Sequence, residues 1–201
     1  MDAALQRRLI EALAGAMIDH ADELTELDRA IGDGDHGVNM KRGFEAVMAE
    51  MNTIGVEPLP QALRSVGTTL VMKVGGASGP LYGTLFLTLG KELPPEPSAA
   101  DLARAAGVAL QALKKLGRSD VGQKTMLDVL APAQEELAAG GDDLCARLAR
   151  RAAAAADATI PLKAIKGRAS FLGERSIGHM DPGARSSSLM IAAACRVLEV
   201  A

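Results

Sequence analysis

Apolar residues recur at helical spacing through most of this 201-residue chain, and that spacing limits the folds open to it. In the first segment, the apolar positions Leu5, Leu9, Leu13 and Met17 repeat every four residues, so one face of a helix is apolar. Hydrophobic residues make up 48% of the chain but aromatic residues only 2%, which suits closely packed helices better than a sheet. We therefore predict one all-α domain over residues 1–201, an up-and-down bundle or barrel of about eight antiparallel helices.

Charge and cysteine content argue against several classes of protein. The net charge is −3, from 22 basic and 25 acidic residues without a long run of either sign, and the chain has one Tyr and no Trp. Such a chain offers neither a basic groove nor rings for base stacking, so we expect no nucleic-acid binding. Cys145 and Cys195 lie far apart in helical patterns, and no apolar run reaches the length of a membrane span. We expect a cytoplasmic protein with reduced, buried thiols that does not cross a membrane.

The stretch DRAIGDGDHGVN is the first candidate for a functional site. It places Asp28, Asp33 and Asp35 close together, with glycines between them that let the backbone turn tightly. Crowded carboxylates repel each other unless a cation lies among them, and hard oxygen ligands suit Mg²⁺. An EF-hand is excluded because Gly37 and Phe44 would occupy the fifth and twelfth positions of its loop. A solvated turn remains the alternative on spacing alone.

Glycine- and charge-rich loops occur at four places, 28–39, 75–79, 117–124 and 166–183, with one or two helices between successive loops. In an antiparallel bundle, loops separated by a pair of helices lie at the same end. We therefore expect several of these loops to form one site at one end of the molecule.

Two of these loops carry groups that suit a phosphate. The sequence GGASG would offer backbone NH groups and the Ser78 hydroxyl at the start of a helix, although a flexible helix-helix corner is the alternative. The long loop carries basic side chains that would neutralise phosphate charge, with a solvated basic surface as the alternative. These basic residues are Lys166, Arg168, Arg175 and His179.

Four stretches follow one another along the chain: LDRAIGDGDHGVNMKRGF, VGGASGPLYGTLF, KTMLDVLAP and KGRASFLGERSIGHMDPGARSS. Together they closely resemble the L subunit of dihydroxyacetone kinase, the nucleotide-binding half of that enzyme, over residues 27–188. The resemblance implies an all-helical barrel of eight antiparallel helices that binds ADP or ATP at one end through magnesium.

The resemblance also implies the site residues. Asp28, Asp33 and Asp35 would hold two Mg²⁺ ions that bridge the nucleotide phosphates, and they would act in catalysis together with Arg168. The remaining nucleotide contacts would come from His36, Gly37, Val38 and Asn39, from Ala77 and Ser78 at the phosphates, from Gly117 and Met126 at the adenine and ribose, and from Arg168, Asp181, Pro182 and Gly183, which would close the pocket. The chain departs from the family pattern at one position. It reads Gly122-Gln123-Lys124-Thr125, whereas the family pattern has an acidic residue in place of Gln123.

The implied reaction transfers the nucleotide γ-phosphate to dihydroxyacetone held on a separate K subunit. Because no K domain is visible in the sequence, we expect an incomplete kinase whose bound ADP is rephosphorylated by the M subunit of a phosphoenolpyruvate-dependent phosphotransferase system. The alternatives are an ATP-dependent kinase subunit for another small ketose such as erythrulose, a nucleotide-state sensor that binds a transcription regulator, and a helical scaffold without a ligand. The sequence leaves two alternatives undecided: whether the chain forms a homodimer, and whether the phosphoryl donor is phosphoenolpyruvate or free ATP.

Overall fold

The computed structural model describes residues 2–200. The regular secondary structure of this part of the chain is entirely helical. The prediction of an all-α protein is therefore confirmed. The elements are α1 (Ala3–Asp19), α2 (Ala21–Ile31), α3 (His36–Ala49), α4 (Met51–Ile54), α5 (Leu59–Lys73), α6 (Ser78–Glu92), α7 (Ala99–Gly117), α8 (Leu127–Ala139), α9 (Leu144–Asp157), the 3₁₀ helix η1 (Arg168–Ser176) and α10 (Pro182–Leu198).

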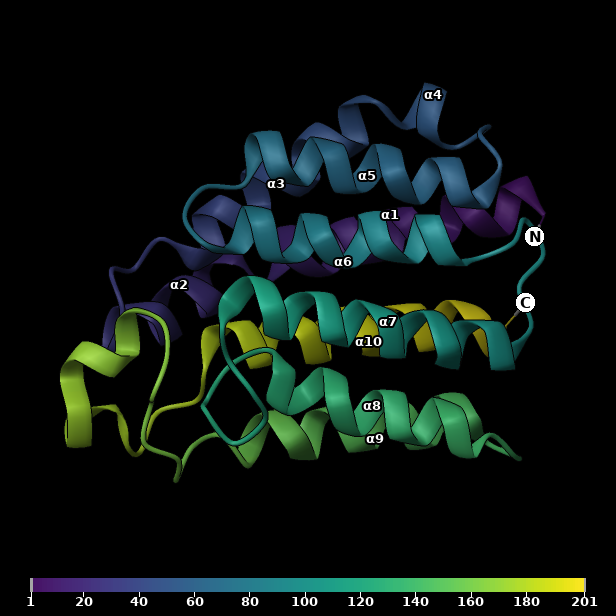
Figure 1. Ribbon diagram of the computed structural model, residues 1–201. Coiled ribbons are helices and arrows are strands. Elements are labelled where there is room, and N and C mark those ends of the chain that lie inside the picture. The colour runs from purple at the N-terminus through teal and green to yellow at the C-terminus, as the bar shows by residue number, and fades with distance from the viewer. Residues whose placement is uncertain (1, 201) are drawn as a thin grey trace.

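Eight of the long helices contact one another in a closed cycle. Helix α1 packs against α3, α3 against α5, each helix from α5 to α9 against the next long helix, and α10 packs back against α1. In Figure 1 these helices lie side by side with similar axis directions, while α2 and η1 lie at one end. The cycle encloses one main hydrophobic core, which includes the edge-to-face pair Phe44 and Phe86 with ring centroids 6.5 Å apart.

Local sequence accounts for several helix boundaries. Ser98 caps α7 with a capping box, in which the Ser98 hydroxyl accepts from the backbone of Asp101 and the Asp101 carboxylate accepts from the backbone of Ser98. Before α8 the arrangement is different: the Asp128 carboxylate accepts from the Thr125 backbone NH at 2.7 Å, and the Thr125 hydroxyl accepts from the backbone NH of Leu127 at 3.2 Å.

The four glycine-rich loops lie at one end of the molecule, and the start of α1 and the end of α10 lie at the other (Figure 1). One cavity draws its wall from all four loops, so their predicted convergence is confirmed. Both cysteines are free, Cys195 buried and Cys145 half-buried. Within residues 2–200, none of the helices combines the length and the apolar character needed to cross a bilayer.

Candidate functional site

The cavity at the loop end has a volume of about 430 Å³, within the usual range for small-molecule sites. Its wall comes from the end of α2 and the acidic loop, the start of α6, the loop before α8, the segment around the start of η1, and the start of α10. Most of the predicted site residues lie in this wall. They are Asp28, Asp33, Asp35, His36, Ala77, Ser78, Met126, Arg168, Asp181, Pro182 and Gly183.

The acidic loop brings three carboxylates together at the edge of the cavity. One oxygen from each of Asp28, Asp33 and Asp35 lies within 4.8 Å of the others. Asp28 is buried and accepts hydrogen bonds from the backbone NH groups of Asp35 at 2.8 Å and His36 at 3.1 Å. Asp33 and Asp35 are exposed, so their oxygens face solvent. An all-oxygen set of this kind, with two of its members open to water, fits Mg²⁺.

Arg168 joins the long loop to the acidic loop. It begins η1, and its Nε lies 2.8 Å from Oδ2 of Asp33. Both side chains are largely exposed, so this ion pair contributes little to stability. A phosphate bound beside the carboxylates could therefore take Arg168 as a partner without loss of a strong contact.

Ser78 and His36 line the same cavity and contact each other. Ser78 begins α6, and its Oγ lies 2.9 Å from Nδ1 of His36, while Nε2 of the same ring lies 2.9 Å from Oγ of Ser186 on α10. Burial lowers the pKa of His36 to about 4, although the charge of Asp28 acts in the opposite direction. The ring is therefore neutral near pH 7, and one nitrogen donates while the other accepts.

Tyr82 extends this hydrogen-bonded chain beneath the cavity. Its hydroxyl donates to the carbonyl of Gly183 at 3.0 Å and lies 2.7 Å from Oγ of Ser186 and 3.0 Å from Oγ of Ser187. Burial raises the pKa of Tyr82 to about 12, so the phenol stays protonated. Tyr82 was not predicted as a site residue, but a signal was present: it is the only tyrosine in the sequence, four residues after Ser78 and thus on the same helix face.

Asp181 is the N-cap of α10, where its Oδ2 accepts from the backbone NH of Ala184 at 2.7 Å. Burial raises the pKa of Asp181 to about 7, and the charges of Asp128 and Asp28 act in the same direction. The charge of Lys124 and the bond from Ala184 oppose this shift. The cap is thus a carboxyl group close to half protonated near neutral pH.

Four predicted nucleotide contacts do not line the cavity within residues 2–200: Gly37, Val38, Asn39 and Gly117. Gly37 faces α2 so closely that an added Cβ would lie 1.9 Å from the carbonyl oxygen of Ala21, so the glycine permits helix packing. Val38 is 55% exposed, and Gly117 is exposed at the end of α7. Contact of these four with a nucleotide stays a prediction.

Asn39 lies behind the second glycine loop, and its Oδ1 accepts from Nη2 of Arg42 at 2.7 Å. An added Cβ at Gly75 would lie 2.7 Å from the same oxygen, so Asn39 supports this loop directly.

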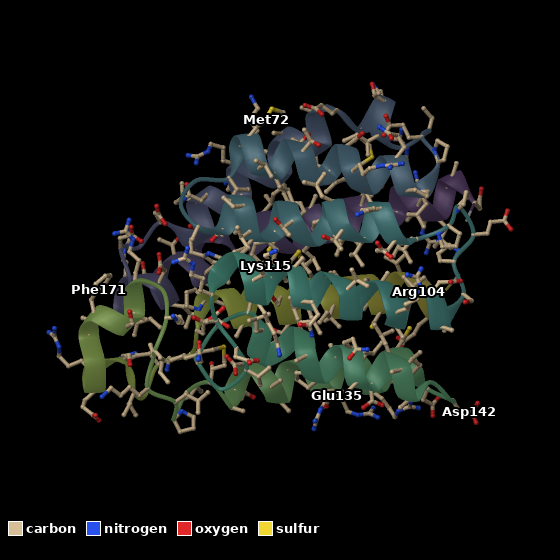
Figure 2. The ribbon with its side chains drawn as sticks, in the orientation of Figure 1. Met72, Arg104, Lys115, Glu135, Asp142 and Phe171 are labelled. Carbon is tan, nitrogen blue, oxygen red and sulfur yellow. The ribbon has the colours of Figure 1, made fainter. Side chains whose placement is uncertain are left out.

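Only two of the four basic side chains singled out in the loop 166–183 reach the cavity. Lys166 and Arg168 line the wall, whereas Arg175 and His179 are exposed and do not line it. Phe171, on η1, is 87% exposed, and Figure 2 shows it on the lobe at the loop end of the molecule.

Gln123, in the loop before α8, does not line the cavity. Its Oε1 accepts from the backbone NH of Asp120 at 3.1 Å. The neighbouring Lys124 lines the wall and was missed as a site residue.

Comparison with known proteins gives consistent results. Residues 30–196 match the family model described as the DAK2 domain. The chain is 46% identical over 173 residues to the ADP-binding subunit DhaL of PEP-dependent dihydroxyacetone kinase 1 from Listeria innocua, covering 83% of this chain and 82% of that protein. It is 42% identical over 176 residues to the corresponding subunit from Escherichia coli, covering 84% of each.

A solved structure shares the fold. The dihydroxyacetone kinase from C. freundii in complex with AMP-PNP and Mg²⁺ superposes with a TM-score of 0.79 at 25% sequence identity. The match covers 96% of this chain and 34% of that chain.

Proposed function

The chain belongs to the DAK2 domain family, and from this membership we propose that it is the nucleotide-binding subunit of a phosphoenolpyruvate-dependent dihydroxyacetone kinase. The observation that carries the proposal is one cavity lined both by the carboxylates of Asp28, Asp33 and Asp35 and by the start of α6. One half of this site suits a metal and the other half suits phosphate.

The carboxylates would hold two Mg²⁺ ions bridging the phosphates of ADP or ATP. Bound magnesium would supply charge stabilisation for phosphoryl transfer. Asp28 is fixed by two backbone hydrogen bonds, so it presents its remaining lone pairs in a set direction. Asp33 and Asp35 are exposed and can adjust to the ions.

The phosphates would lie at the N-terminus of α6. Backbone NH groups at the start of a helix attract anions, and the Ser78 hydroxyl adds a donor there. Lys166 and Arg168 line the same cavity and would balance the remaining phosphate charge. Met126 lines the same cavity and would offer an apolar surface to the nucleoside.

Transfer to dihydroxyacetone needs a partner, because the ketone would be held on a separate K subunit. Asp33, Asp35 and Arg168 are exposed, so the γ-phosphate end of the site would face an incoming partner. The M subunit of the phosphotransferase system would rephosphorylate ADP that stays bound. The related subunits from L. innocua and E. coli are named as ADP-binding subunits of PEP-dependent kinases, which supports this order of events.

A reconstituted assay tests the relay. The chain, its K and M partners, the general phosphotransferase proteins and catalytic ADP are expected to phosphorylate dihydroxyacetone when phosphoenolpyruvate is supplied. Labelled ADP bound to the chain should exchange slowly over many turnovers. Rapid exchange of that ADP, with full turnover on ATP and without the M protein, would contradict the relay and indicate an ATP-dependent kinase.

A further inference from the structure

Lys124 is a buried lysine whose ammonium group binds backbone carbonyls. The side chain is 1% exposed, and no ion pair within residues 2–200 includes it. Its Nζ donates to the carbonyl oxygens of Thr159 at 2.9 Å and Leu162 at 3.0 Å, lies 3.4 Å from that of Ile160, and also donates to that of His179. A charge removed from water needs such partners, because unpaired burial is strongly unfavourable.

All four carbonyls belong to the irregular segment between α9 and α10. The carbonyls of Thr159 and Ile160 also accept from backbone NH groups of the same segment. Those of Leu162 and His179 accept only from Lys124 among the residues that the structure describes. Without the ammonium group, two buried or partly buried acceptors would lose their donor.

The contacts lie directly behind the wall of the cavity. His179 is two residues before Asp181, and the backbone NH of Asp181 donates to the Thr159 hydroxyl at 3.0 Å. Thr159 and His179, both held by Lys124, therefore fix the turn that presents Asp181 and the start of α10 to the site. Lys124 itself precedes Thr125 and Met126, which line the same cavity. Its ammonium thus joins the loop before α8 to the turn before α10.

We propose that Lys124 is a positioning residue, an internal cation that holds the carbonyls of Thr159, Leu162 and His179 and thereby sets the Asp181–Gly183 wall of the nucleotide site. The nucleotide readout of this inference rests on the proposed function, whereas the carbonyl cage does not. Lys124 is expected to act through the backbone and to leave the bound nucleotide untouched.

The test uses a cation that can replace the missing group. Lys124→Ala leaves a carbonyl-lined space that ammonium ion can enter, whereas Lys124→Met keeps a side chain of similar length without a donor and fills that space. Both variants are expected to weaken Mg·ADP binding by about 10- to 100-fold, the range for residues that support a ligand from behind. Lys115→Ala, at an exposed lysine on α7 labelled in Figure 2, is the matched control and should bind as the unchanged protein does.

Ammonium chloride should restore most of the Mg·ADP affinity and the thermal midpoint of Lys124→Ala, and neither property of Lys124→Met. Tetramethylammonium chloride at the same ionic strength should restore neither, because it has no N–H donor. The thermal midpoint is measured without nucleotide, so rescue of stability tests the cage even if the unchanged protein proves not to bind Mg·ADP.

Three results would overturn the inference. Unchanged affinity in both Lys124 variants would show that the turn is set without this residue. Lost affinity that ammonium does not restore, with an unchanged thermal midpoint, would assign Lys124 to the nucleotide itself. If Lys124→Ala does not fold even in ammonium chloride, then Lys124→Met decides, and affinity equal to that of the unchanged protein would refute the positioning role.

Discussion

Among single residues, the three carboxylates of the acidic loop are not equivalent. Asp28 is buried and accepts two backbone hydrogen bonds, which makes it part of the loop's own structure. Asp33 is exposed, and its ion pair with Arg168 is solvent-screened. Substitution of Asp33 can therefore remove a metal ligand with little effect on the fold.

We expect Asp33→Asn to unfold at nearly the same temperature as the unchanged protein when both are free of ligand, because one carboxylate charge leaves a crowded cluster. Mg·ADP at about 100 times its Kd should stabilise the unchanged protein by about 2.7 kcal/mol and should not stabilise Asp33→Asn. Thermal unfolding with and without Mg·ADP measures both. Asp142→Asn, at an exposed site on the opposite end shown in Figure 2, is the control. Equal stabilisation of Asp33→Asn would show that the metal assignment is wrong.

Ser186 connects His36 to Tyr82, and its removal would take the hydrogen-bond partner from Nε2 of the buried His36, while the Tyr82 hydroxyl would keep Gly183 and Ser187. We expect Ser186→Ala to lower the free energy of unfolding by roughly 1–3 kcal/mol and to weaken Mg·ADP binding, because Ser78 loses its support through His36. Ser188 is buried on the same helix and donates only to the carbonyl of Arg185, so Ser188→Ala is the matched control. Urea unfolding and calorimetric titration give the two quantities. Equal nucleotide affinity in both variants would argue against the connection.

Sequence reasoning located the residues whose chemistry depends on their neighbours in the chain. The acidic cluster and Ser78 stand within short motifs, so their place in the cavity wall could be predicted from the local sequence, while their roles toward metal and phosphate stay predictions. Tyr82 and Ser186 are 104 residues apart and meet only because the first turns of α6 and α10 both reach the cavity. Likewise, Nζ of Lys124 donates to carbonyls 35 to 55 residues further along the chain, which come within its reach only in the folded protein. Such contacts depend on helix packing, which residue spacing does not specify.

At the level of elements, the N-terminus of α10 has an unusual cap. Asp181 is buried between Lys124, Asp128 and Asp28, and its pKa in the folded state, about 7, lies above the ordinary 3.8. Between these two values the folded state binds more protons than the unfolded state. The contribution of Asp181 to the free energy of unfolding is therefore present at low pH and is lost as the pH rises from about 4 to about 7.

Asp181→Asn keeps an oxygen for the Ala184 NH but cannot titrate. We expect the free energy of unfolding of Asp181→Asn, minus that of the unchanged protein, to rise between pH 5 and pH 8. His36 changes its protonation in the opposite sense but is present in both proteins, so it cancels in this difference. Urea unfolding across that pH range, without metal or nucleotide, gives the difference. Parallel curves for the two proteins would mean that Asp181 is not the raised group.

Helix boundaries were predictable where caps or prolines mark them and less so elsewhere. The capping box before α7 is one case, because Ser98 and Asp101 stand three residues apart as this motif requires. Helix α6, by contrast, begins at Ser78 directly after a turn in which Gly76 adopts a φ of +62°. The 3₁₀ helix η1 lies in a stretch without helical periodicity, where Ala169 packs under Ile31 in a small separate cluster.

For the whole molecule, the class of the fold and the gathering of the loops at one end followed from helical spacing and connection lengths. The order in which the helices pack around the core did not follow from these features. Helix α1 contacts α3 and α10, which lie before and after it in the closed cycle, more extensively than its chain neighbour α2. This closure brings the start of α10 beside the acidic loop, and no local pattern contains that information.

Native mass spectrometry of the chain mixed with ADP and magnesium tests the nucleotide site as a whole. The site described above predicts a species with one ADP and two Mg²⁺ ions per chain. This species should be absent when Asp33→Asn is measured under the same conditions. Spectra that show only the ligand-free chain, at ADP and magnesium concentrations that saturate known nucleotide-binding proteins, would contradict the assignment of this cavity as a nucleotide site.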